Sequence, residues 1–168
     1  MCARRESRKR QLQQALERGM IAISMSRLRI PIYFDYASTL CYIAWRIVTP
    51  LEDELGFEAL WKGVPIAARD FRAKPGRVLG ERERQKVLFV AAETGVRVAP
   101  PSSWIDSSAA LQGSEIARDA GVFPAYHDAV FRAAFDDGEN IADPKVLDAI
   151  AHRAGRSRKA AISKPARE

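Results

Sequence analysis

The sequence predicts an α/β domain that opens with a strand, a polar turn, a helix and a second strand, and then continues as an all-helical block. Two observations predict this fold class. Residues 28–34 alternate apolar and polar side chains, as a strand does, and after Gly80 apolar residues recur at helical spacing. The 168-residue chain is 47% hydrophobic and 29% charged, which is enough to bury one core.

The first half of the chain holds the α/β elements. In the strand at 28–34, Pro31 is unfavourable because proline removes a donor from the hydrogen-bonded ladder. After the polar turn, apolar spacing predicts a helix over 40–56, and Pro50 should kink this helix or end its first section. A second strand is expected at 60–67.

The second half reads as helices separated by short loops. Helical spacing predicts helices at 81–94, 106–120 and 125–135. The last helix should begin at Asp143-Pro144, where an N-cap residue precedes proline at the first helical position.

Charge divides the chain into three segments. Residues 1–30 carry eight Lys/Arg and two acidic residues, and residues 153–168 carry six Lys/Arg and one acidic residue, so two basic ends flank an acidic body. No aromatic residues are interleaved with these charges, so we expect solvated ends and no nucleic-acid binding. We expect a basic extension at 1–24, disordered or a frayed helix, a domain at 25–155, and a basic tail at 156–168.

Several other classes of function lack their signals in this sequence. No apolar run approaches the roughly 20 residues of a membrane span, so no membrane partner is expected. The charged N-terminus does not read as a secretory signal, so a cytoplasmic location is expected. No metal-ligand spacing, phosphate loop or hydrolase elbow occurs, and Cys2 and Cys41 cannot form a disulfide scaffold.

The most informative stretch is residues 33–44, which read YFDYASTLCYIA. It resembles the strand–turn–helix of the DsbA family, in which an aromatic-Asp strand end leads into Cys-x-x-Cys-Tyr at a helix N-terminus. Ser38 takes the place of the first cysteine of that motif, and Cys41 takes the place of the second.

A second stretch, residues 129–155, supports the same resemblance. It reads AVFRAAFDDGENIADPKVLDAIAHRAG and is similar to the helical insertion of that family. The resemblance therefore implies a thioredoxin-like fold with an all-helical insertion at about 79–155. The family's next segment reads Gly-Val-Pro-Thr/Ala-Phe, whereas Pro165 follows no such strand, so we expect the closing strands to be missing and the sequence to be truncated.

The chemistry of the motif follows from its place at a helix start. Unpaired N–H groups and the positive end of the helix dipole stabilise a thiolate there. Ser38 cannot form a disulfide, so the resemblance implies a thiol–disulfide oxidoreductase-like protein in which Cys41 is limited to one-thiol exchange with a small-molecule thiol or a thiol-containing protein.

Two other functions remain open. Ser38 and Tyr42 also resemble the motif of kappa-class glutathione transferases and 2-hydroxychromene-2-carboxylate isomerases, where the serine hydroxyl donates a hydrogen bond to the sulfur of glutathione. Thr39, Leu40 and Cys41 depart from that motif. Glutathione is then the expected cofactor, and we do not expect it to be tightly bound. A homodimer remains an open alternative for the oligomeric state. The third alternative is a non-catalytic remnant.

Each of these residues also has a purely structural interpretation. In this interpretation Ser38 is simply a helix N-cap, Cys41 is a half-buried helix residue and Asp35 is a turn-former. His127 and His152 show no partner spacing, so we interpret both as ordinary helix residues.

Overall fold

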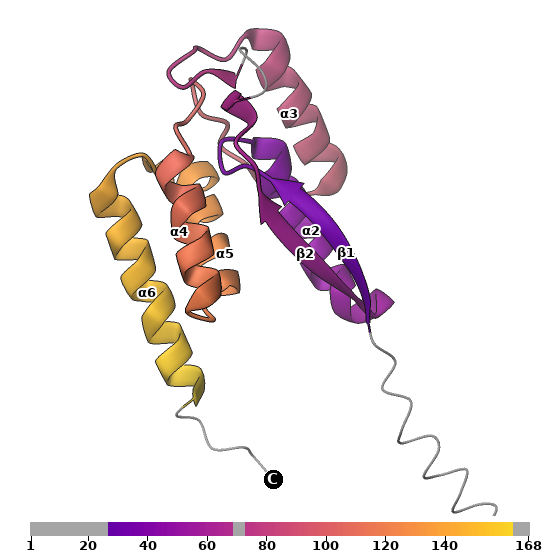
Figure 1. Cartoon of the computed structure of the whole chain (residues 1–168). Coiled ribbons are helices and arrows are strands. Elements are labelled where there is room, and N and C mark those ends of the chain that lie inside the picture. The colour runs from indigo at the N-terminus through magenta and orange to yellow at the C-terminus, as the bar shows by residue number, and fades with distance from the viewer. Residues whose placement is uncertain (1–26, 69–72, 163–168) are drawn as a thin grey trace, which may run out of the picture.

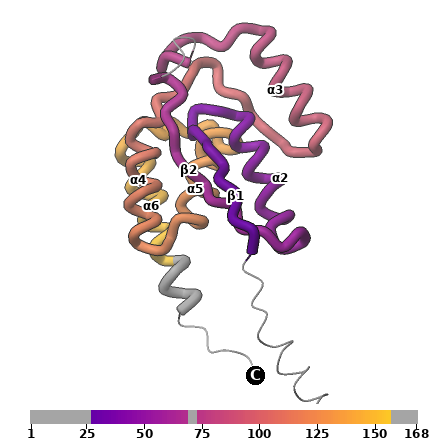
Figure 2. The backbone as a smooth tube through the Cα atoms, turned by 45° about the vertical axis from the view of Figure 1, so that its right-hand side comes forward, coloured from indigo at the N-terminus to yellow at the C-terminus, as the bar shows by residue number. Residues whose placement is uncertain are grey.

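A computed structural model describes residues 27–68 and 73–162 of the chain. Two parallel strands, β1 (Leu28–Phe34) and β2 (Phe57–Gly63), are joined by the helix α2 (Thr39–Leu55). A short 3-10 helix, η1 (Ile66–Ala68), follows β2. The remaining elements are four α-helices joined by loops: α3 (Glu81–Thr94), α4 (Ser108–Asp119), α5 (Phe123–Phe135) and α6 (Pro144–Ile162). This order confirms the predicted α/β fold with a helical block. In Figures 1 and 2, α4, α5 and α6 lie to one side of the two strands, whereas α3 lies beside α2.

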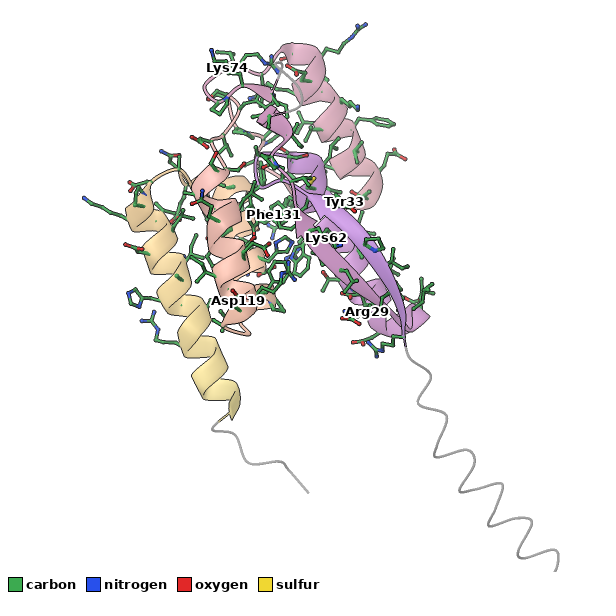
Figure 3. The ribbon with its side chains drawn as sticks, viewed as in Figure 1. Arg29, Tyr33, Lys62, Lys74, Asp119 and Phe131 are labelled. Carbon is green, nitrogen blue, oxygen red and sulfur yellow. The ribbon has the colours of Figure 1, made fainter. Side chains whose placement is uncertain are left out.

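One face of the small sheet forms the core with α2 and α5. The Trp61 ring lies 5.2 Å from the Trp45 ring of α2 and 6.3 Å from the Phe34 ring, measured between centroids. The opposite face carries Arg29 and the 61%-exposed Tyr33, both labelled in Figure 3. The apolar half of the alternation in β1 therefore marks the buried face, although Leu28 and Ile30 at its start stay exposed.

Pro31 fits into β1 because its backbone faces away from β2. The Phe34 carbonyl accepts a hydrogen bond from the Val64 N–H at 2.8 Å, so Phe34 and Ile32 direct their backbone groups toward β2. Backbone groups of successive strand residues point to opposite sides, so those of Pro31 point away from β2. On that edge no described strand pairs with β1. The missing N–H of Pro31 therefore removes no hydrogen bond from the ladder.

The structure corrects two predictions in the first half. The second strand begins at Phe57 instead of residue 60, because Gly56, with a φ of 70°, ends α2 and turns the chain directly into the strand. Pro50 does not end the helix, since α2 continues through it to Leu55. Pro50 and Arg46 are both exposed, so water can hydrate the Arg46 carbonyl that has lost its helical donor.

The helical block agrees more closely with the sequence. The bounds of α3 are those expected, whereas α4 begins two residues later and α5 two residues earlier than the spacing predicts. The helix α6 runs past residue 155 to Ile162, into the segment expected as a tail. The expected extension at 1–24 and Pro165 lie outside the described residues.

Candidate functional site

The turn between β1 and α2 is held by a buried carboxylate. Asp35 is 1% exposed and accepts hydrogen bonds from the N–H of Ala37 at 2.9 Å, from the N–H of Ile66 at 2.6 Å and from the Ser107 hydroxyl. Its carbonyl oxygen accepts from the Ser38 N–H at 3.1 Å. Asp35 is thus the turn-former that the sequence suggests, and it also ties the turn to the loops that precede α3 and α4.

Ser38 is the N-cap of α2 and leaves the first helical amides free. Its hydroxyl oxygen accepts from the Cys41 N–H at 3.3 Å, and its carbonyl accepts from the N–H groups of Cys41 and Tyr42. No described residue accepts a hydrogen bond from the N–H of Thr39 or Leu40. The first turn of α2 also contains no acidic side chain. The end of the helix dipole therefore keeps two donors available for an anion.

A small cavity opens at these amides. Its volume is about 170 Å³, and α2, α3 and the loop before α4 form its walls. Its lining consists of Ala37, Ser38, Thr39, Leu40, Leu79, Glu83, Arg84, Lys86, Val87, Pro100 and Trp104. Ser38, Thr39 and Leu40 thus line one cavity.

The charges on the cavity wall favour an anion. Arg84 and Lys86 contribute two cations from α3. Glu83 is the one carboxylate among the described lining residues, and Arg77 holds it through an ion pair of 2.6 Å between Nη2 and Oε1. That pairing leaves a net positive charge facing the end of α2, and the sequence analysis did not identify either basic residue as part of a site.

Cys41 and Tyr42 lie outside this cavity. Cys41 is half-buried with a free thiol, and its side chain packs against the aromatic core. Tyr42 is 1% exposed and donates a hydrogen bond to Asp136 on the far side of the core at 2.8 Å. Burial, together with this hydrogen bond to a carboxylate, raises the pKa of Tyr42 to about 12. Of the three predicted site residues, Ser38 alone lines the cavity.

His127, which the sequence indicates as an ordinary helix residue, contacts the turn that precedes Ser38. It is fully buried, and its Nδ1 lies 2.9 Å from the hydroxyl of Tyr36, two residues before Ser38. Burial, together with the nearby Arg118 guanidinium, lowers the pKa of His127 to about 3. Its Nε2 has no described hydrogen-bond partner. The sequence feature that indicates its burial is the spacing of four residues from Phe123, which places both side chains on the apolar face of α5.

Two further kinds of site are not seen in the described residues. Residues 27–68 and 73–162 contain no group of three His, Cys, Asp or Glu side chains that could hold a metal ion. No helix within the described ranges is both long and apolar enough to cross a bilayer.

Solved structures share the fold at low sequence identity. A probable DsbA oxidoreductase from Streptomyces coelicolor matches with a TM-score of 0.57 and 20% identity, covering 83% of this chain and 69% of that protein. A candidate protein disulfide isomerase from Nitrosomonas europaea matches with a TM-score of 0.53 and 18% identity, covering 77% of this chain and 65% of that protein. This chain therefore spans about two thirds of the length of either protein.

The sequence match is stronger evidence for kinship than these structures. No curated protein matches the chain. The family model described as DSBA-like thioredoxin domain, however, matches residues 29–167, which include β1 except for Leu28, all of α2 and β2, and the whole helical block. The chain belongs to the family of DSBA-like thioredoxin domains.

Proposed function

We propose that the chain binds a small-molecule thiol of the glutathione type at the N-terminus of α2 and holds its sulfur there as a thiolate. One observation carries the proposal: Ser38 and the free amides of Thr39 and Leu40 line the same cavity, whereas Cys41 does not. The sulfur anion that this family's motif places at the helix start is then supplied by the ligand.

The role of Ser38 follows from its hydrogen bonds. Its hydroxyl oxygen already accepts from the Cys41 N–H, so its own proton is available to donate to a ligand sulfur. A hydrogen bond to the charged form of a thiol lowers its pKa, and the two free amides act in the same direction. Because the thiolate is the nucleophilic form, the bound thiol is activated toward an electrophilic second substrate.

The size and charge of the cavity limit what it can hold. At about 170 Å³ it is smaller than the roughly 300 Å³ at which pockets for whole ligands begin, so it takes the thiol-bearing end of a tripeptide and leaves the rest outside. Arg84 and Lys86 on α3 then offer cations to the carboxylates of such a ligand.

Paired titrations with reduced glutathione and S-methylglutathione test this role. We expect Ser38→Ala to weaken the binding of reduced glutathione about 10- to 150-fold, since a hydrogen bond to a charged group contributes about 1.5–3 kcal/mol. The affinity for S-methylglutathione, which has no thiol proton to lose, should change far less. Calorimetry with purified protein measures both affinities.

The control is Ser102→Ala, at an exposed serine outside the cavity, which should leave both affinities unchanged. Equal losses for the two ligands in Ser38→Ala would show that the serine acts only as a helix cap. No saturable binding of reduced glutathione by the wild-type chain would refute the proposal itself.

One-thiol exchange at Cys41 is the second candidate, because this free thiol is only half-buried and directly follows Leu40, which lines the cavity. In that reaction the Cys41 thiolate attacks one sulfur of a disulfide, forms a mixed disulfide and releases the other half as a thiolate. Mass spectrometry after incubation with oxidised glutathione tests this candidate in a Cys2→Ser background. Full modification that persists in Ser38→Ala would favour exchange, and no modification of Cys41 would exclude it.

A further inference from the structure

A second and larger cavity lies in the helical block, between α4 and α6. Its volume is about 730 Å³, and α4 and α6 form its two walls as they run side by side in Figure 1, with residues at the start of α5 at its base. Its lining includes Gln112, Gly113, Ile116, Tyr126, Asp148 and Ala151. It shares no residue with the cavity at Ser38.

Small side chains on both walls keep this cavity open while the helices remain packed. The helix α6 contacts both α4 and α5, so the hollow lies within a packed bundle. Tyr126 closes its base, since the ring is 3% exposed and its hydroxyl donates to the Ala110 carbonyl at 3.3 Å. A Cβ at Gly113 would clash with the Tyr126 hydroxyl, so glycine is what lets this ring lie against α4.

The lining determines the class of molecule that fits. Gln112, Asp148 and Tyr126 are the polar side chains among the lining residues, and Asp148 is the one charged group. No Arg, Lys or His among the side chains that the structure describes lines the cavity, so an anionic ligand would meet the Asp148 carboxylate without a compensating cation from these residues. A mostly apolar wall with a few polar groups, at a volume between about 300 and 1,000 Å³, is typical of sites for small organic molecules.

We propose that the cavity between α4 and α6 binds an uncharged or cationic, mainly apolar organic molecule, with its polar end directed toward Asp148 and Gln112. The 71%-exposed Ile116 lies on the rim, so the cavity is open to solvent and a ligand can enter without unfolding the bundle. The site is separate from the proposed thiol site, and each can fail without the other.

Two fluorescent probes that differ by one sulfonate group test this proposal. N-phenyl-1-naphthylamine is neutral, and 8-anilino-1-naphthalenesulfonate has the same two ring systems with an added sulfonate. We expect saturable binding of the neutral probe and about fivefold weaker binding of the sulfonate, because a like-charge contact at an exposed site costs about 1 kcal/mol. Asp148→Asn should reduce the difference in affinity between the two probes.

Two substitutions on α6 provide a matched pair. Ala151 and Ala149 are both exposed, but only Ala151 lines the cavity. Ala151→Trp should fill the cavity and weaken the binding of the neutral probe at least tenfold. The Ala149→Trp variant should bind this probe with the wild-type affinity. Gln112→Trp fills the cavity from the α4 side and should give the same loss, which keeps the test valid if one variant fails to fold.

Several outcomes would overturn the proposal. These are no saturable binding by the wild-type chain, equal binding in Ala151→Trp and wild type, or equal losses in the variants at positions 151 and 149. The proposal would also be overturned if light scattering showed that the wild-type chain is a dimer and that Ala151→Trp is a monomer. The cavity would then hold a second copy of the chain.

Discussion

The buried histidine of α5 should make the stability of the fold depend on pH. His127 has a pKa of about 3 in the folded chain and an ordinary value of 6.5 when the chain is unfolded. Below about pH 6.5 the unfolded chain therefore binds a proton that the folded chain does not, so stability is full above that pH and falls as the pH drops toward 3.

The size of this effect follows from the two pKa values. Between about pH 7.5 and pH 5 the linkage relation gives a loss of about 2 kcal/mol in the free energy of unfolding from this single group. Carboxylates titrate mainly below this window, and the chain contains only one other histidine, His152, which is exposed. The window therefore isolates His127.

Urea unfolding followed by circular dichroism at both pH values measures the loss. His127→Phe keeps an aromatic ring in the cluster and removes the titrating group, so its stability should be nearly the same at the two pH values, although lower at both because the Tyr36 hydroxyl loses its partner. His152→Gln should retain the wild-type dependence. The reasoning is refuted if the wild-type chain is equally stable at both pH values, or if His127→Phe keeps the full loss.

Three further pairs of substitutions test the structure around the two cavities by the same unfolding measurement. Asp35→Asn should lower the free energy of unfolding by about 1–3 kcal/mol because this buried carboxylate accepts three hydrogen bonds, two from backbone N–H groups and one from a serine hydroxyl, while Asp119→Asn at an exposed position should have no effect. Gly113→Ala should cost about 1–3 kcal/mol because the new methyl group meets a buried tyrosine, whereas Gly155→Ala has open space and should be neutral or stabilising by up to about 1 kcal/mol. Ser38→Ala should cost about 1 kcal/mol and Ser38→Gly only a few tenths, and equal costs would contradict the capping role.

Local signals in the sequence predict the elements next to the candidate site. The alternation in β1 and the polar turn that ends at Ser38 locate the start of α2, because both depend on residues close together in the chain. The bounds of α3 are also local, since Gly80 precedes the helix and Gly95, with a φ of 69°, ends it. These features need no knowledge of tertiary packing.

The surroundings of Ser38 could not be predicted in this way. Arg84 and Lys86 read as ordinary exposed charges on α3, and only the position of that helix beside the end of α2 makes them part of a cavity. The contact between Tyr36 and His127 joins residues 91 positions apart. Its partial signal is the helical spacing of apolar residues around His127, which predicts burial but not the partner.

Serine at position 38, where the resemblance to the DsbA motif implies a cysteine, would change which molecule must bring the negative charge. A thiolate at the cap of α2 would satisfy the helix dipole within the protein, whereas the Ser38 hydroxyl is neutral and leaves the amides of Thr39 and Leu40 without an acceptor among the described residues. Cys41 cannot take over this role from its place against the core, where its side chain lies outside the cavity. The unmet charge preference at the helix start is therefore the physical reason to look for an anionic sulfur on a ligand before looking for one on the chain.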